Sequence, residues 1–176
     1  YIAKLNPGNL PLASSYKLGN WQFITENQNP ALYQLTNVLT ESYQYDRDRL
    51  VQGTDETSGI STVYLWAYNG THPVAEIRNA TFANVVQSLG GDYMVNQLYN
   101  SYTPNMNVVN NLRNVLINSQ VTTMTFKLLV GVTSITDPRG IKTSYEYDSF
   151  GNLKNIRDLN NRLLQTIQVH YIGEYL

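Results

Sequence analysis

TSITDPRGIKTSYEYDSFGNLKNIRDLNNRLLQTIQVHY, residues 133–171, carries the strongest fold signal in this chain. Three turn signals, DPRG, SFGN and DLNN, separate four short segments that can alternate apolar and polar residues. A period of two is typical of strands with one buried face, and Gly, Pro, Asn and Asp clusters are typical of turns. The segment therefore predicts a run of antiparallel β-hairpins.

The central strand of this segment has two distinct faces. Tyr145 and Tyr147 lie on one face, and Glu146 and Asp148 lie on the other. Gly151 is expected to supply a positive φ in the following turn, where the Asp148 carboxylate can accept backbone N–H groups. Residues that are expected to set the hairpin geometry are Asp137, Gly140, Tyr145, Tyr147, Asp148 and Gly151.

An earlier segment repeats this pattern imperfectly. Tyr43-Gln44-Tyr45-Asp46 echoes Tyr145 to Asp148, and Leu50 matches Leu153. The first copy, YDRDRL, is one residue shorter than YDSFGNL and lacks its glycine, so we expect a tighter or irregular turn. Alternating charges at 46–49 indicate a solvated turn in which opposite charges neutralise each other. We interpret residues 41–78 as a first, degenerate hairpin unit.

A second hairpin signal follows in that unit. In the strand 62–68, alternation places Thr62, Tyr64, Trp66 and Tyr68 on one face. Asn69-Gly70 comes next, and this dipeptide favours a type I′ turn, which needs positive φ at both central residues. Residues 74–78 are the expected returning strand. Residues 1–40, punctuated by Pro and Gly, are expected to form an irregular leader in which Trp21 and Phe23 share a strand face.

Between residues 81 and 118 the apolar period changes to that of helices. Three short amphipathic helices are predicted, the first capped by Thr81 and stopped by Gly90-Gly91. Asp92 is the predicted cap of the second helix, and Thr103-Pro104 is the predicted start of the third. The side chains expected to face inward are Phe82, Val85, Val86, Leu89, Met94, Val95, Leu98, Tyr99, Tyr102, Val109, Leu112, Val115 and Leu116. A further strand is predicted over 121–130, with Met124, Phe126, Leu128 and Val130 on one face.

Composition excludes several classes of protein. The 176 residues carry a net charge of −1, and only 14% of them are charged, so no electrostatic feature indicates a nucleic acid or an anionic membrane as partner. The chain has no cysteine, which excludes disulfides and cysteine-based zinc sites. No apolar run approaches the ~20 residues that span a bilayer. Because the chain begins at Tyr1 without Met, we expect it to be a fragment of a larger chain.

The hairpin pattern resembles the YD repeat of the RHS family of bacterial surface and secreted proteins. The resemblance covers residues 133–171 and, more weakly, 41–70, and YLWAYNGTHPVAEIRNATFANV is similar to a block found in Bacteroidetes-type members. The resemblance implies a large parent protein at the cell surface or outside the cell. In some members of the family the repeats wind as a β-shell around a toxin segment, and carbohydrate binding has been attributed to such repeats.

Candidate chemistry is sparse. His72 follows a turn and His170 lies on a polar strand face, and neither has a partner at a recognised ligand spacing, so no metal and no cofactor are predicted. A hydrolase would require a cleft that gathers one of these histidines with carboxylates. The candidate ligand-binding residues are exposed aromatics, Tyr64, Trp66 and Tyr68, which could stack on sugar rings. The alternative is that they pack between sheet and helices.

The sequence therefore predicts an α+β fold in one domain, 1–176. It consists of an antiparallel sheet of hairpins, interrupted by a three-helix insertion at about 81–118 and completed by the repeat hairpins at 121–176. The first hypothesis for its function is a non-enzymatic assembly module, which pairs with further repeats or with a copy of itself through strand edges. The second is a carbohydrate-binding module, and the third is a hydrolase.

Overall fold

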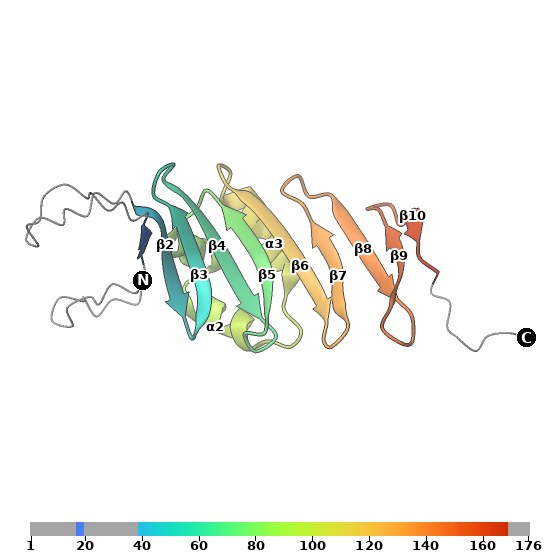
Figure 1. Ribbon diagram of the computed structural model, residues 1–176. Helices are drawn as coiled ribbons and strands as arrows, with labels where there is room; N and C mark the ends of the chain where they lie inside the picture. The colour runs from blue at the N-terminus through green and yellow to red at the C-terminus, as the bar shows by residue number, and fades with distance from the viewer. Residues whose placement is uncertain (1–16, 20–38, 169–176) are drawn as a thin grey trace, which may run out of the picture.

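A computed structural model describes residues 17–19 and 39–168. Its strands form one antiparallel sheet in chain order, β1 to β10, and its three helices lie between β5 and β6 (Figure 1). The elements are β1 Lys17–Gly19, β2 Leu39–Asp46, β3 Arg49–Asp55, β4 Ile60–Ala67, β5 His72–Arg78, α1 Phe82–Leu89, α2 Asp92–Asn100, α3 Met106–Val115, β6 Gln120–Lys127, β7 Gly131–Thr136, β8 Lys142–Tyr147, β9 Leu153–Arg157 and β10 Leu163–Thr166. This confirms the predicted α+β fold, with its antiparallel sheet and helical insertion.

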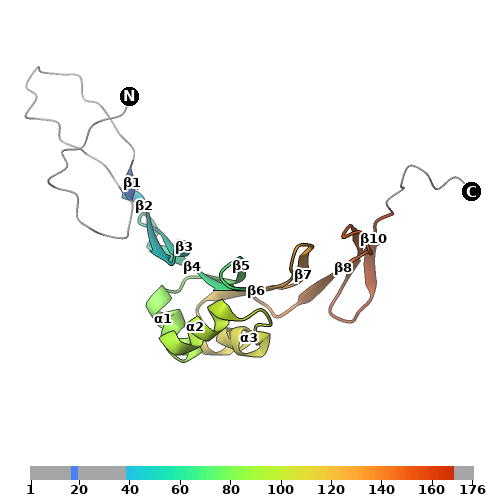
Figure 2. The same cartoon turned by 90° about the horizontal axis from the view of Figure 1, so that it is seen from below.

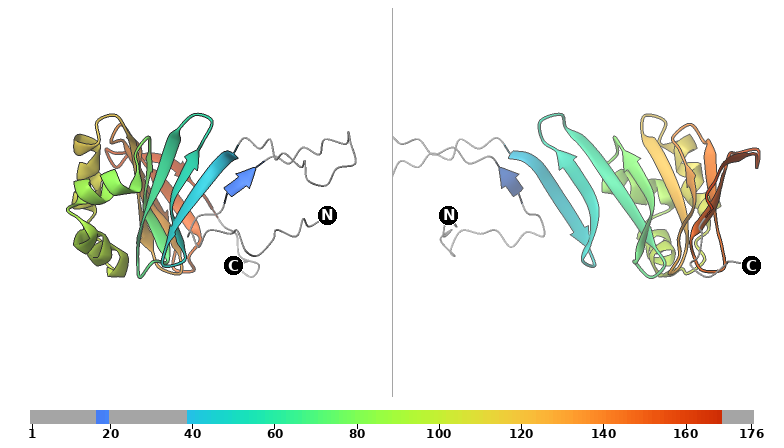
Figure 3. Two further views of the ribbon diagram at one scale, coloured as in Figure 1. Left: turned by 90° about the vertical axis from the view of Figure 1, so that its left-hand side faces the viewer. Right: turned by 45° about the vertical axis from the view of Figure 1, so that its right-hand side comes forward.

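The helices cover one face of the sheet. Figure 2 shows all three beneath β4, β5 and β6, on the convex side of a curved sheet. Figure 3 shows the same two layers from the side, with no described element on the concave face. The two ends of the sheet therefore extend beyond the helical layer.

The core lies between the central strands and the helices. In β4 the buried residues alternate with half-buried ones, so that Val63, Leu65 and Ala67 face the helices. Val85 and Leu112 are buried opposite them, in α1 and α3. Burial of a large aliphatic side chain contributes roughly 1.5–3 kcal/mol, which makes this cluster the main source of stability in the described residues.

The helix boundaries differ slightly from those expected. Thr81 caps α1 as predicted, because its hydroxyl accepts from the Asn84 N–H. Gly91, not Asp92, is the N-cap of α2. Asn105, not Thr103, caps α3, and its side chain accepts from Asn107 N. Asparagine satisfies the free N–H groups at a helix N-terminus as well as threonine does. Residue preference alone therefore did not distinguish Asn105 from Thr103 as the cap.

Two residues that were expected to face inward are exposed. Tyr102 lies beyond the end of α2, and its side chain is 61% exposed. Val115, the last residue of α3, is 51% exposed. The first prediction was wrong because α2 ends at Asn100, before Tyr102. The second was wrong because Leu112 and Leu116 occupy the inward positions at the end of α3 and leave Val115 exposed.

The turn after β4 is longer than a two-residue hairpin. Tyr68, Asn69 and Gly70 all have positive φ, and Ala67 pairs with His72 across a four-residue loop. The predicted positive φ at Asn69 and Gly70 is thus confirmed. Tyr68, however, does not continue the face of Tyr64. Its side chain is 5% exposed in the core, where its ring contacts those of His72 and Phe126 edge-on or nearly so.

The strand predicted over 121–130 ends at Lys127. The pairing of β6 with β7 contains a β-bulge in β7, where Thr133 is an extra residue between the partners of Thr125 and Phe126. Residues 128–130 form the turn to β7, and Leu129 has a positive φ and an exposed side chain. Met124 and Phe126 therefore do not share one face with Leu128 and Val130. A bulge adds one residue to one strand, and no local sequence signal marked it here.

Candidate functional site

Three turns of the repeat hairpins have the same hydrogen-bond pattern. In the first, Asp137 Oδ1 accepts from Arg139 N at 2.9 Å and from Ile141 N at 2.8 Å. In the second, Asp148 Oδ1 accepts from Phe150 N at 2.8 Å and from Asn152 N at 2.9 Å. In the third, Asp158 Oδ1 accepts from the backbone N–H groups of Asn160 and Arg162, both at 2.9 Å. In each turn the aspartate carboxylate thus serves as the hydrogen-bond acceptor for two backbone N–H groups.

The fourth position of each turn has positive φ. Gly140 and Gly151 have φ of 82° and 85°, and Asn161 has 62°. The N–H of each of these residues donates to the carbonyl of the aspartate three positions earlier. Glycine adopts this conformation without strain, and asparagine tolerates it better than most residues.

The third turn was only partly recognised from sequence. DLNN was identified as a turn, but Asp158 and Asn161 were not assigned the roles that Asp148 and Gly151 have. The signal was present as D-x-x-[G/N], because residues 137, 148 and 158 are spaced by 11 and 10 positions. The middle turn also begins at Asp148, one residue before the SFGN signal.

The turn aspartates are stabilised in their charged form. The backbone N–H of Ile141 lowers the pKa of the Asp137 carboxyl, and Arg139 contributes in the same direction. The backbone N–H of Arg162 lowers the pKa of the Asp158 carboxyl in the same way. Hydrogen bonds donated to a carboxylate favour its ionised form, so these turns are most stable when both aspartates are charged.

The tyrosines of the repeat occupy the concave face of the sheet. Tyr147 donates its hydroxyl to Val132 O at 2.8 Å, and its ring lies over Gly131, where a Cβ would meet the hydroxyl at 2.6 Å. Tyr145 pairs with Ile156 of β9 and is half-buried. The Tyr147 side chain therefore connects β8 to the start of β7. This contact requires glycine at residue 131, because a larger residue would clash with the Tyr147 hydroxyl.

The first hairpin has a tight turn but is not simply solvated. Asp46 pairs with Arg49 across a two-residue loop, which is the tighter turn that the shorter copy predicted. Arg47 and Asp48 have φ of 48° and 59°, the values of a type I′ turn, although neither is glycine. Arg47 pairs with Asp46 at 2.7 Å, and its guanidinium also lies 3.9 Å from the centre of the Tyr99 ring. Arg49 Nε donates to Gly70 O at 2.6 Å. The arginines thus connect this turn to α2 and to the neighbouring loop, which corrects the expectation of a free solvated turn.

β10 is the last described strand of the sheet. Its inner edge pairs with β9, and no described strand pairs with its outer edge. The N–H of Ile167 donates to Lys154 O at 2.8 Å. Because successive N–H groups of a strand point to opposite sides, the N–H of Thr166 points away from β9. Leu163 and Leu164 are both more than half exposed on this strand.

The concave face has a shallow depression near β2, β3 and β4. Its volume is about 410 Å³, and Tyr43, Leu50, Thr62, Tyr64 and Arg78 are among its lining residues. Gly53 lies at its floor, where a Cβ would meet the Tyr43 ring at an ordinary distance of 3.5 Å. Tyr64 is thus placed in a hollow with polar groups around it.

The other two candidate aromatics have structural partners. Trp66 is half-buried, and its indole N–H donates to Leu50 O at 2.8 Å, where β3 and β4 are no longer paired. Tyr68 is buried, and its hydroxyl accepts from Phe126 N at 3.1 Å. An exposed stripe of Tyr64, Trp66 and Tyr68 is therefore not formed.

The histidines contribute no recognisable catalytic group in the described part of the chain. His72 packs against Phe126 with ring centres 4.6 Å apart, and its Nδ1 contacts the Thr71 hydroxyl at 2.8 Å. His170 lies outside the described residues. Residues 17–19 and 39–168 hold no cluster of three His, Cys, Asp or Glu side chains that could bind a metal ion. No helix in these ranges is both long and apolar enough to cross a bilayer.

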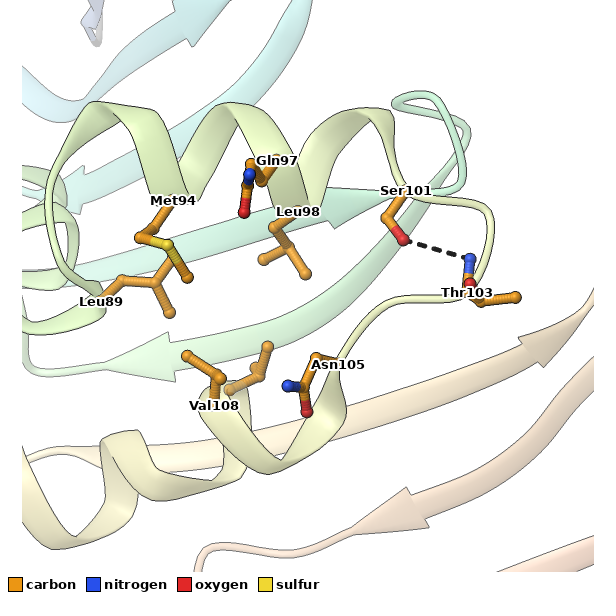
Figure 4. Close-up of a pocket in the computed structure, with 9 residues that line it drawn as sticks. Leu89, Met94, Gln97, Leu98, Ser101, Thr103, Asn105 and Val108 are labelled. Atoms are coloured by element: carbon orange, nitrogen blue, oxygen red, sulfur yellow. Dashed lines mark hydrogen bonds between the residues drawn. The ribbon is translucent and has the colours of Figure 1, made fainter.

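The helical layer contains a pocket of its own. It measures about 200 Å³ and opens between α2 and α3 (Figure 4). Leu98 and Val109 line it together with Leu89 and Met94, and polar groups of Ser101, Thr103 and Asn105 also border it. Sequence reasoning did not identify this pocket, because it depends on how two helices pack and not on a motif.

The repeated Asp turns and the meandering sheet define a class of β-hairpin repeat protein. Residues 130–166 match the family model described as RHS Repeat, and all three Asp turns lie within the matched residues. The match confirms the resemblance to the RHS/YD-repeat family, and the chain carries an RHS repeat. A comparison with curated proteins found no match.

Proposed function

We propose that this chain is a non-enzymatic assembly module whose role is to extend its sheet through strand edges. The partner is a further repeat of a longer parent protein, or a second copy of the chain. The observation that carries this proposal is the outer edge of β10, which has outward backbone groups and two exposed leucines. Unpaired strand edges readily accept another strand.

The composition of β10 supports this role. Its residues, LLQT, include no lysine, proline or other residue that natural proteins use to block an edge. A strand that pairs with β10 would cover Leu163 and Leu164 in part and would satisfy the outward N–H of Thr166. The hairpins before β10 already repeat this arrangement, since β8, β9 and β10 follow one another through turns of the same type.

A chain with one additional repeat tests this proposal. The full chain is extended at its C-terminus by a second copy of residues 131–166, and its thermal midpoint is compared with that of the original chain. If the edge accepts repeats, the extended chain melts at a higher temperature in one cooperative transition. A separate transition for the added copy, with no change in the original midpoint, would contradict the proposal.

Thr166→Pro provides the matched control. Proline removes the outward N–H of residue 166 and leaves the N–H of Ile167 bonded to Lys154. In the extended chain this substitution should abolish most of the gain in midpoint. An undiminished gain would show that stabilisation arises from another contact.

The family match supports a structural role for the repeat and agrees with a site at the cell surface or outside the cell. We therefore place the parent protein among surface or secreted bacterial repeat proteins. Immunodetection of the parent protein on intact cells and in the medium tests this placement. Detection only after lysis would contradict it.

A second candidate function is carbohydrate binding at the depression on the concave face. The observation that favours it is the combination of Tyr43 and Tyr64 with Thr62 and Arg78 around one hollow. Aromatic rings offer an apolar face, and the neighbouring polar groups can bond hydroxyls.

A glycan array tests this second function. Any glycan that binds should lose affinity with Tyr64→Ala but retain it with Tyr145→Ala, a tyrosine of the same face that lies outside the depression. Equal effects of the two substitutions, or no binding at all, would remove this function.

A further inference from the structure

The outer surface of the helical layer is almost free of charge. Residues 79–120 include only two charged side chains, Asp92 and Arg113. Arg113 points to the sheet, where it donates to Thr136 O at 2.9 Å and to Asp137 O at 3.1 Å. The exposed side chains of the helices are mainly amides, namely Asn84, Gln87, Asn96, Gln97, Asn100, Asn107, Asn111 and Asn114.

Such a surface differs from that of a typical soluble domain. Roughly a quarter to a third of surface residues are usually charged. Depletion of charge and enrichment of tyrosine distinguish the centre of a protein interface from the remaining surface. Here two exposed tyrosines, Tyr93 and Tyr102, accompany the amides, with 69% and 61% of their surface exposed.

The pocket between α2 and α3 opens on this same surface (Figure 4). Its volume of about 200 Å³ exceeds the ~150 Å³ of an engineered apolar cavity that binds benzene, so one aromatic ring fits. Leu98 and Val109 supply apolar contacts, and Ser101 and Thr103 lie at the end of α2 and beyond it. Tyr102 lies between those two residues in the sequence, and its side chain is 61% exposed.

We infer that the helical layer binds a second copy of this chain, with Tyr102 of each copy in the pocket of the other. Such an interface is isologous, because the same surface serves both partners and the anchor and pocket lie close to the two-fold axis. Amide side chains suit it, since each one both donates and accepts hydrogen bonds. A charged partner fits less well, because its charges would lose water without gaining opposite charges.

This interface is separate from the edge of β10. The helices lie on the convex face beneath β4 to β6, and β10 is at the end of the sheet (Figure 2). The two contacts can therefore be removed independently.

Sedimentation velocity of the full chain over a range of about 1–100 μM tests the inference. We expect a concentration-dependent dimer that Tyr102→Glu weakens at least tenfold, because the carboxylate would be buried without a partner. Phe150→Glu is the control, since Phe150 is also an exposed aromatic residue but belongs to the turn between β8 and β9. Circular dichroism establishes that each variant is folded, and Tyr102→Ala serves as a second variant if Tyr102→Glu is not.

The outcomes separate the two proposals. A dimer that is lost with Tyr102→Glu but retained with Phe150→Glu and Thr166→Pro supports the helical interface. A dimer that survives Tyr102→Glu and is lost with Thr166→Pro overturns it and assigns association to the edge of β10. A chain that is monomeric throughout the range also overturns it, while the extended-chain experiment still tests the assembly function.

Discussion

One carboxylate oxygen organises each repeat turn, since it accepts two backbone N–H groups that would otherwise have no partner within the turn. The residue three positions later must then adopt positive φ, and Gly140, Gly151 and Asn161 do so. This combination explains why an aspartate and a glycine or asparagine recur at fixed spacing. Residues between them vary because their side chains are exposed.

Gly151→Val should lower the free energy of unfolding by about 1–3 kcal/mol, because a β-branched residue is strained at a φ of 85°. Gly53→Ala is the control, since Gly53 lies within β3 without positive φ and has room for a methyl group. Urea denaturation measures both variants. A loss for Gly53→Ala as large as that for Gly151→Val would show that the turn conformation is not the cause.

Stability should fall in acid partly through the turn aspartates. The folded pKa of Asp137 and Asp158 is lower than the unfolded value of about 3.9. Their contribution is therefore complete above the unfolded pKa and is lost as the pH falls through the folded pKa. Thermal midpoints between pH 7 and pH 2 should show this loss.

The double variant Asp137→Asn/Asp158→Asn should depend less on pH, since asparagine oxygens accept the same bonds without titrating. Asp48→Asn is the control, an exposed aspartate of the first hairpin turn. An unchanged slope of midpoint against pH in the double variant would contradict the role assigned to these carboxylates.

At the scale of elements, Arg113 joins the helical layer to the repeat hairpins. Its guanidinium lies beneath α3 and donates to Thr123 Oγ1 at 3.1 Å, to Thr136 O at 2.9 Å and to Asn110 Oδ1 at 2.7 Å. Burial lowers its pKa from the ordinary value, while the nearby Asp137 charge opposes this effect. One side chain thus fixes α3 to β6 and to the end of β7.

Arg113→Lys should cost about 1–3 kcal/mol, because an ammonium cannot reproduce the planar fork and would leave buried acceptors without a donor. Arg139→Lys is the control, since the Arg139 side chain is 79% exposed and its ion pair should contribute little. Denaturant unfolding compares the two variants. Equal small effects would mean that Arg113 does not hold α3 on the sheet.

The periodicity of apolar residues in the sequence predicted the strands and helices of the central region well, because each of them buries one face. It placed three helices between residues 81 and 118 and anticipated the tight turn at Arg47-Asp48. The bulge at Thr133 and the burial of Tyr68 could not be predicted, since both depend on pairing and on contacts between distant residues. The outer edge of β10, which no described strand pairs, and the pocket between α2 and α3 likewise arise only when the strands and helices are assembled.

At the scale of the whole molecule, the sheet is a simple meander in which every strand pairs with its neighbours in sequence. The helices cover only the centre of the sheet (Figure 2). The stability of the end that bears the RHS repeat therefore depends on strand pairing and on the turns. Under the proposed assembly role such an arrangement is lengthened one hairpin at a time, because each added strand presents a new edge of the same kind.

Amide hydrogen exchange of Thr166 in the chain extended by one repeat tests the assembly role most directly. The N–H of Thr166 points away from β9, so it should exchange rapidly in the original chain and at least tenfold more slowly in the extended one. The N–H of Ile167, which already donates to Lys154 O, serves as the internal reference. Equal exchange of Thr166 in both chains would contradict the account, because it would show that the edge of β10 does not accept a further repeat.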